Sequence, residues 1–190
     1  MDLFEQALIF AMEKHRGQTR KDSAAPYLLH PMEVAAIAAT MTDDPEVLAA
    51  ALLHDTVEDA GVDPQEITDR FGDRVAELVF SETEDRPDGA PDEASWFTRK
   101  ASSLNRFRSM NDRGVRILWI SDKLANLRSF SRQYDSVGTK IWEYCHQRDP
   151  AKQAWYYRSI AEAAIELRDT AAYREFITIY RKLFSNEKEL

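Results

Sequence analysis

The segment that most constrains the fold runs from Asp44 to Leu53 and contains almost no polar side chain after its first turn. Asp44-Pro45 is typical of a helix start, with Asp44 as the N-cap and Pro45 at the first helical position. The residues that follow, Val47 to Leu53, are all apolar, so a helix here has no polar face to turn towards solvent. We therefore expect this helix to lie at the centre of the fold.

The remaining sequence also has the spacing of helices. Apolar residues recur three or four positions apart, and alternation of apolar and polar residues never extends beyond a few positions. Asp63-Pro64-Gln65-Glu66 predicts a capping box at the start of a short helix. We expect further helices over residues 3–14, 31–42, 64–71, 73–83, 95–110, 114–134, 140–147, 149–167 and 170–184. The pattern predicts an all-α fold, one domain over residues 1–190, built as a bundle of roughly eight to ten helices.

Composition excludes several classes of protein. The chain has 190 residues and a formal net charge of −8, which argues against a broad nucleic-acid-binding face. Its apolar runs are too short to span a membrane, its N-terminus lacks a basic signal-peptide region, and its single cysteine cannot form an internal disulfide. We therefore expect a soluble, cytoplasmic protein with no nucleic-acid or membrane partner. A phosphorylated ligand would require Lys and Arg side chains gathered locally at its site.

Four polar residues follow the apolar segment: His54, Asp55, Glu58 and Asp59. If the helix continues, an advance of ~100° per residue places all four on one face. Such groups at the end of an apolar helix are costly unless they are paired or coordinated, so the cluster indicates a site. The His-Asp pair could bind one metal ion, and the second pair could hold and deprotonate a water on it. The alternative interpretation is a solvated, acidic helix end.

A second cluster lies further along the chain. Asp122 follows an apolar run at residues 117–120, Asn126 comes one helical turn later, and Ser129 lies close to the same stripe. A carboxylate that emerges from so apolar a run repeats the pattern at Asp55. Taken alone, Asp122 could also be a buried carboxylate bonded to an arginine or to a helix terminus.

The other candidate ligand is His30, which stands at the start of a helix between Pro26 and Pro31. In isolation His30 could be a helix cap or a core histidine. The two remaining histidines, His15 and His146, lie in polar contexts and are predicted to be structural.

These segments together resemble the HD-domain hydrolases of the RelA/SpoT type, and most of all the free-standing small alarmone hydrolases. The matching blocks are His15-x-Gly17-Gln18-x-Arg20-Lys21, Pro26-Tyr27-x-x-His30-Pro31-x-x-Val34-Ala35, Ala50-Ala51-Leu52-Leu53-His54-Asp55-x-Val57-Glu58-Asp59, Phe71-Gly72 and Asp122-Lys123-Leu124-x-Asn126-Leu127. The resemblance covers residues 4–130. It implies an all-α HD domain that uses one Mn²⁺ ion to remove the 3′-pyrophosphate from (p)ppGpp, a small-molecule nucleotide.

The resemblance also implies roles for individual residues. The metal ligands would be His30, His54, Asp55 and Asp122, a set of donors that suits Mn²⁺ or another divalent ion. The pair that orients and activates the attacking water would be Glu58 and Asp59. The substrate contacts would be Arg20 and Lys21 in the nucleotide pocket, Asn126 near the sugar, Ser129 at a small hydroxyl position and, on a weaker match, Tyr156.

Basic residues in or near these blocks are expected to form a local positive funnel within the acidic chain. They are Arg20, Lys21, Arg99, Lys100, Lys123, Arg128 and Lys152. For Arg99, Lys100 and Lys152 the alternative is an ordinary solvated charge.

Three features depart from the family pattern. Ser121 precedes Asp122 where the family has alanine, but it is small, so the ligand position should be kept. Residues 84–94 form an acidic stretch with two prolines and a glycine, either a lid or a plain surface loop. The aromatic stretch 142–157 is also less typical, and these last two features leave the identity of the nucleotide open. The alternative functions are hydrolysis of another nucleotide or phosphorylated metabolite, such as NADPH, and alarmone binding without catalysis.

Overall fold

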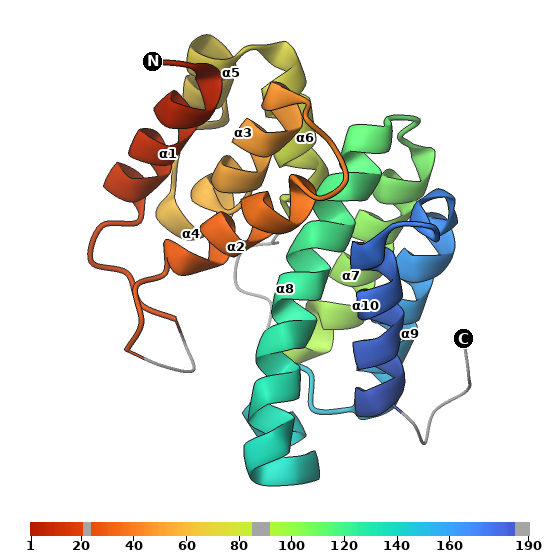
Figure 1. The fold of residues 1–190 in the computed structure, drawn as a ribbon. Helices are drawn as coiled ribbons and strands as arrows, with labels where there is room; N and C mark the ends of the chain where they lie inside the picture. Colours follow the sequence, from red (N-terminus) through yellow and green to blue (C-terminus); the bar gives the residue numbers. More distant parts are fainter. Residues whose placement is uncertain (21–23, 85–91, 185–190) are drawn as a thin grey trace.

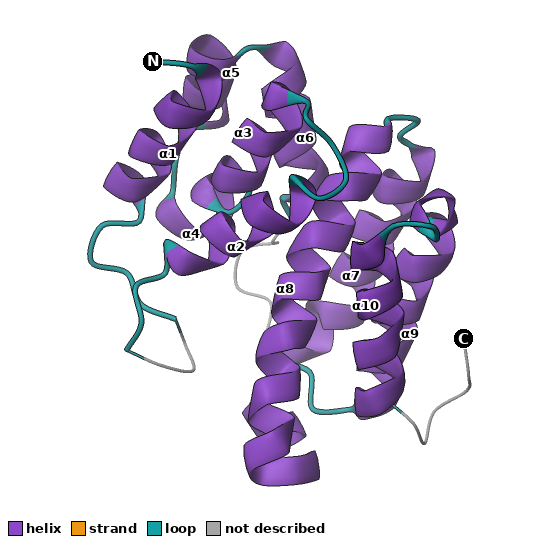
Figure 2. Cartoon of the chain, viewed as in Figure 1, coloured by secondary structure: helices purple, strands orange, loops and turns teal. Residues whose placement is uncertain are grey.

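The computed structural model describes residues 1–20, 24–84 and 92–184, with residues 92–94 described by their backbone alone. Within these ranges the chain forms ten α-helices and two 3₁₀ helices and contains no β-strand (Figures 1 and 2). The elements are α1 (Leu3–Lys14), α2 (Leu29–Ala38), α3 (Pro45–Leu53), α4 (Thr56–Ala60), α5 (Pro64–Phe71), α6 (Asp73–Glu82), α7 (Asp92–Ser109), α8 (Arg113–Val137), η1 (Gly138–Tyr144), α9 (Pro150–Ala163), η2 (Ile165–Leu167) and α10 (Ala171–Leu183). The predicted all-α class is confirmed.

The apolar helix α3 is enclosed on several sides, as its sequence predicts. Its residues Ala49 to Leu53 are completely buried, and α1, α2, α6 and α8 pack against it. Asp44 caps its first turn by accepting a hydrogen bond of 3.0 Å from the N–H of Glu46. Complete burial of Leu52 or Leu53 contributes about 1.5–3 kcal/mol each, so α3 is a major source of the stability of this region.

The long helix α8 lies between two groups of helices, α1 to α6 on one side and α7, α9 and α10 on the other (Figure 1). It packs against α2, α3 and α6 on one side and against η1, α9 and α10 on the other. The ring of Trp119 on α8 stacks on Phe107 of α7, with centroids 4.4 Å apart. A single hydrophobic core extends from Ala7 to Phe184, and α8 carries Asp122 into it beside α2 and α3.

Several predicted boundaries differ from the structure. The helix predicted over 140–147 is the 3₁₀ helix η1, and the one predicted over 149–167 ends at Ala163 and is followed by η2. The predicted capping box is only half formed, because Asp63 accepts from the N–H of Gln65 while Glu66 pairs with Lys14 at 2.9 Å. Most of the acidic stretch 84–94 lies outside the described residues, and α7 begins at Asp92.

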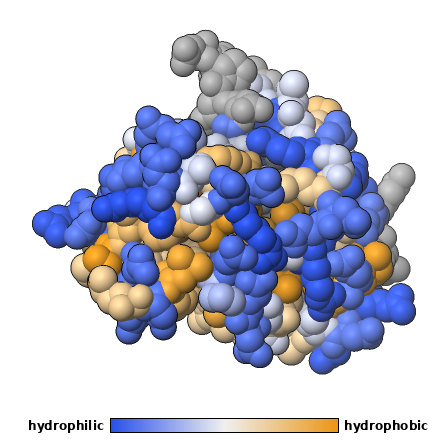
Figure 3. All heavy atoms as spheres, turned by 90° about the horizontal axis from the view of Figure 1, so that it is seen from above, coloured by the Kyte–Doolittle hydropathy of each residue, from blue (hydrophilic) through white to orange (hydrophobic). Residues whose placement is uncertain are grey.

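Figure 3 shows one face of the molecule, on which hydrophilic residues surround and partly cover apolar ones. Among the described residues, large exposed apolar side chains are distributed over several elements and include Ile9, Met12, Leu29, Met32, Phe97, Tyr144 and Ile165. None of the helices in the described ranges combines the length and the hydrophobicity needed to cross a bilayer.

Gly114, in the first turn of α8, sets how closely α8 approaches α3. A Cβ atom added there would lie 2.8 Å from Cγ2 of the buried Val47 and 3.0 Å from Oδ1 of Asp112. Helix propensity alone favours Gly→Ala by about 0.5–1 kcal/mol, but overpacking costs about 1–3 kcal/mol, and the stiff Val47 side chain cannot move aside easily.

We therefore expect Gly114→Ala to lower the free energy of unfolding by about 1–3 kcal/mol, measured by denaturant titration. Ser136→Ala, at an exposed position of the same helix, is the control and should change stability by less than about 0.5 kcal/mol. A gain in stability from Gly114→Ala would contradict the close approach of α8 to α3.

Candidate metal site and adjoining pocket

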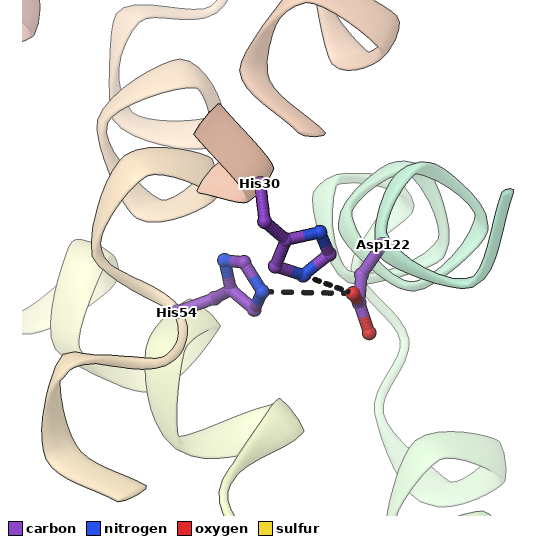
Figure 4. Close-up of side chains that lie close together, drawn as sticks. All are labelled: His30, His54 and Asp122. Carbon is purple, nitrogen blue, oxygen red and sulfur yellow. Dashed lines mark ion pairs between the residues drawn. The ribbon is translucent and has the colours of Figure 1, made fainter. Parts of the chain in front are cut away.

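The structure brings the four predicted metal ligands together from three segments. His30 is the second residue of α2, His54 and Asp55 lie between α3 and α4, and Asp122 lies in α8. Figure 4 shows His30, His54 and Asp122 pointing towards one another. Nε2 of His30 is 3.0 Å from Oδ1 of Asp122 and 3.5 Å from Oδ2 of Asp55. Nε2 of His54 is 3.0 Å from Oδ2 of Asp55 and 3.6 Å from Oδ1 of Asp122.

The continuous helix predicted through residues 54–59 is wrong. α3 ends at Leu53 and α4 begins at Thr56, so His54 and Asp55 form a turn between two helices. The hydroxyl of Thr56 donates to the carbonyl of Leu53 at 2.7 Å, a local bond that competes with helical pairing. The N–H of Asp59 still donates to the carbonyl of Asp55 at 2.8 Å. Glu58 and Asp59 are therefore on a separate short helix, one turn beyond the His-Asp pair.

The donor atoms at His54 fit a divalent cation. Its Nδ1 lies 2.9 Å from the carbonyl oxygen of Ala51, so Nδ1 carries the proton and Nε2 presents its lone pair to the cluster. That Nε2 is buried and has no hydrogen-bond partner among the described residues. Burial lowers the pKa of His54, but the charges of Asp55 and Asp122 outweigh it and raise the pKa well above its usual value. The cluster thus attracts a proton, and a metal ion competes for the same lone pair.

Asp122 is held as a carboxylate by Lys123 on its own helix and by His30 and His54. Burial raises the pKa of Asp122, but the opposing effect of Lys123 and the two histidines is larger. The pKa therefore lies well below its usual value. Asn126 Nδ2 donates to its Oδ1 at 2.8 Å, and Lys123 Nζ donates both to its Oδ2 and, at 2.8 Å, to Glu82. Ser121, which stands where the family has alanine, is buried and donates to the carbonyl of Ile117 at 2.7 Å, within the same helix.

Tyr27 is a site residue to which sequence reasoning gave no role. Its hydroxyl lies 2.6 Å from Oδ2 of Asp55 and 2.8 Å from Oδ2 of Asp59. Gln18 Nε2 donates to the backbone carbonyl of Asp59 at 2.9 Å, and Gln18 Oε1 lies 2.8 Å from Nδ1 of the buried His15. His15 thus packs beside Gln18 and Tyr27, and a purely structural role for it stays a prediction. The only sequence signal for Tyr27 was its place in the block that contains His30.

Glu58 faces a group of charges between α6 and α7. The backbone N–H of Glu84 points at Oε2 of Glu58 at 3.4 Å. The Glu84 carboxylate pairs with both Arg99 and Lys100. Although burial raises the pKa of Glu84, Lys100 and Arg99 lower it below its usual value. Arg99 and Lys100 thus serve first as partners of Glu84, which the sequence did not indicate.

A cavity of about 250 Å³ adjoins His30 between α2 and α8. It is lined by Arg20, Ala25, Leu29, His30, Glu33, Ala125, Ser129, Arg132 and Gln133. Two of the predicted substrate contacts, Arg20 and Ser129, are in this lining. Asn126 is instead bonded to Asp122, Tyr156 is buried beneath Lys100 with its ring 4.8 Å from Nζ, and Lys21 lies outside the described residues.

The predicted positive funnel is largely neutralised in the described residues. Arg99 and Lys100 pair with Glu84, and Lys123 pairs with Glu82 and Asp122. Arg128 binds Glu175 at 2.7 Å and Glu33 at 3.2 Å. Lys152 is exposed on α9. The arginines that line the cavity are Arg20 and Arg132. Positive charge at the pocket therefore comes from fewer residues than the sequence led us to expect, because most of the expected set has an acidic partner close by.

Comparison with known proteins decides the family. Residues 7–148 match the model of the HD domain, and this range contains all four clustered residues. The chain belongs to the HD-domain family. HD-domain hydrolases are metal-dependent, and this HD domain contains a cluster of His30, His54 and Asp122 whose ligand atoms lie within 4.8 Å of one another.

Similar proteins agree with the predicted resemblance. This HD domain is 36% identical over 136 residues to the guanosine-3′,5′-bis(diphosphate) 3′-pyrophosphohydrolase of Vibrio cholerae, a match that covers 68% of this chain and 18% of that protein. The chain thus spans about a fifth of the length of this curated relative. Among solved structures, lmo0812 from Listeria monocytogenes EGD-e is 31% identical with a TM-score of 0.70, covering 82% of this chain and 99% of that one.

A second solved structure shares the fold. It is described as a metazoan ortholog of SpoT that hydrolyses ppGpp, and it has a TM-score of 0.72 with 96% of each chain covered. Its identity to this HD domain is 24%, so the likeness establishes the arrangement of helices.

Proposed function

We propose that this HD domain is a metal-dependent hydrolase that removes the 3′-pyrophosphate from (p)ppGpp, and that Mn²⁺ is its ion. The observation that carries the proposal is the convergence of two histidines and two aspartates beside a Glu-Asp pair and a cavity of about 250 Å³. The name of the Vibrio cholerae relative supports the choice of substrate. The continuous core from Ala7 to Phe184 supports a single domain over residues 1–190.

In this proposal His30, His54, Asp55 and Asp122 hold the ion. A bound divalent cation would supply Lewis-acid activation of a phosphate oxygen and of water. The lowered pKa of Asp122 and the buried His54 Nε2, which faces the cluster without a hydrogen-bond partner among the described residues, support their assignment as ligands. Mn²⁺ suits a mixed imidazole and carboxylate set with further positions left open.

Glu58 and Asp59 would orient the attacking water and take up its proton, since they follow the ligand turn by one helical turn. The water would attack the phosphorus that is bonded to the 3′ oxygen of the ribose. The bond between that oxygen and the phosphorus breaks, so intact pyrophosphate leaves and the ribose keeps a 3′ hydroxyl. The cavity beside His30 would hold the nucleoside, with Arg20 and Ser129 in contact with it. We retain Lys21, Asn126 and Tyr156 as proposed substrate contacts.

Two alternatives follow from the same site. Arg132 in the pocket lining is a cationic group that would suit a phosphate of a different metabolite, such as NADPH or another nucleotide. A protein that binds the alarmone without cleaving it would also need this pocket, but would have no use for a Glu-Asp pair beside the ligand turn.

Product analysis tests the proposal directly. We expect ppGpp incubated with the protein and Mn²⁺ to yield GDP and pyrophosphate, resolved by anion-exchange chromatography, and to remain intact after chelation of the metal. A nucleotide panel in the same assay separates the alternatives. Preferential cleavage of a substrate without a 3′-phosphate would favour the other metabolite, and tight ppGpp binding without product would favour the binding protein.

A further inference from the structure

Tyr27 contacts both halves of the proposed chemistry. Its hydroxyl oxygen lies within 2.6 Å of the proposed metal ligand Asp55 and within 2.8 Å of Asp59, one of the two proposed water-activating residues. The acceptor on Asp55 is Oδ2, the same oxygen that faces Nε2 of His54 and of His30. One phenol thus lies between the atom that would bind the ion and the side chain that would handle the water.

The hydroxyl can keep two carboxylates close to each other. Two carboxylates repel when both are ionised. A phenol has one hydrogen and an ordinary pKa of about 10, so near neutral pH it is a donor with a single proton to give. It can donate to Asp55 or to Asp59 at one moment while its dipole offsets the repulsion between them. Loss of the hydroxyl would leave the two aspartates without this shared partner.

The ring of Tyr27 is itself fixed by its neighbours. Its centroid is 4.9 Å from that of His15 and 6.0 Å from that of His30, which meets it edge to face. The guanidinium carbon of Arg20 lies 5.7 Å from the ring centroid. Gln18, in the same segment, binds the backbone of Asp59 at 2.9 Å. Gln18 and Tyr27 therefore hold the main chain and the side chain of Asp59, respectively.

We propose that Tyr27 is a positioning residue, whose hydroxyl sets the Asp59 side chain against the metal-facing oxygen of Asp55. The inference rests on the proposed function, because Asp59 needs a defined position only if it handles the attacking water. It does not assign Tyr27 a contact with the substrate.

The test is Tyr27→Phe, which removes the hydroxyl and keeps the ring with its contacts to His15 and His30. For ppGpp at saturating Mn²⁺ we expect kcat to fall by about 10–100-fold, with KM within roughly threefold of the wild type. Isothermal titration should show Mn²⁺ affinity weaker by about tenfold, because Asp55 loses its partner.

Tyr173→Phe is the matched control. Tyr173 is buried, whereas Tyr27 is half-buried, and the Tyr173 hydroxyl donates to the carbonyl of Ala161 at 2.9 Å, on α9 and away from the site. The variant loses a comparable hydrogen bond and should keep both kcat and Mn²⁺ affinity. If Tyr27→Phe behaves like Tyr173→Phe in both measurements, the inference is overturned.

A double variant tests whether Tyr27 acts through Asp59. In an Asp59→Asn background, Tyr27→Phe should lower kcat by no more than about twofold further, because the group it positions has already been changed. A full additional loss would overturn the role through Asp59. If the wild type releases no pyrophosphate at all, the proposed function fails. The Mn²⁺ titration alone then decides whether Tyr27 positions Asp55. Weaker binding in Tyr27→Phe but not in Tyr173→Phe then supports the positioning of Asp55, and equal binding overturns it.

Discussion

Asp55→Ala is expected to lose Mn²⁺ binding and ppGpp hydrolysis together. Oδ2 of Asp55 lies 3.0 Å and 3.5 Å from the Nε2 atoms of His54 and His30, so its removal takes a charged donor from the middle of the cluster. Metal activation contributes several kcal/mol and each 1.36 kcal/mol is tenfold in rate, so we expect a loss of at least about 1000-fold.

The metal itself can be followed by thermal unfolding. For the wild type, Mn²⁺ at 100 times its Kd should add about 2.7 kcal/mol of stability, visible as a rise in Tm. Asp55→Ala should show no such rise. Asp43→Ala, at an exposed position just before α3, is the control and should keep both the Tm shift and the activity. Full hydrolysis by Asp55→Ala would remove Asp55 from the proposed ligand set.

Glu58→Gln is expected to bind Mn²⁺ normally and to lose turnover. In the wild type, the N–H of Glu84 lies 3.4 Å from Oε2 of Glu58. Gln has the size of Glu and an oxygen that can accept this hydrogen bond, but it has no carboxylate to take up a proton. General-base catalysis contributes typically 10²–10⁴-fold, so kcat for ppGpp should fall by about that factor. Steady-state kinetics at saturating Mn²⁺ measure the fall, and the Mn²⁺-dependent Tm shift shows that the ion still binds.

The matched control is Glu77→Gln, which makes the same change at an exposed position of α6 and should leave turnover unchanged. Two outcomes would contradict the assignment. Wild-type kcat in Glu58→Gln would exclude Glu58 as the base, and a lost Tm shift would place Glu58 among the groups that hold the ion.

The sequence predicted those features that depend on apolar pattern and local capping. A helix without a polar face has to be enclosed, so the central place of α3 followed from residues 47–53. His30, His54 and Asp122 each stand beside an apolar run, and the structure brings all three to one point. The resemblance to a family supplied what pattern could not, namely that segments far apart in the chain belong to one site.

Features that depend on tertiary contacts were not predictable in this way. At the break after Leu53, the Thr56 hydroxyl donates a hydrogen bond to the carbonyl of Leu53. A prediction that advances each residue by a fixed helical angle takes no account of such a side-chain bond. Lys and Arg were counted as free positive charge, but Glu84 pairs with both Arg99 and Lys100 across the α6–α7 boundary. Tyr27 was overlooked because a tyrosine signals no metal chemistry by itself, and its role depends on where Asp55 and Asp59 lie.

The direct packing of α3 against α8 has a consequence for how this site can vary among related sequences. His54, at the end of α3, and Asp122, in α8, keep their separation through helix contacts rather than through the chain that connects them. The entropy of closing a connecting loop grows only with the logarithm of its length, so each doubling costs about 0.6 kcal/mol. Insertions and deletions in the loops between α4 and α8 can therefore accumulate while the separation of His54 and Asp122 is kept, provided that the helices packed against α3 and α8 stay in place.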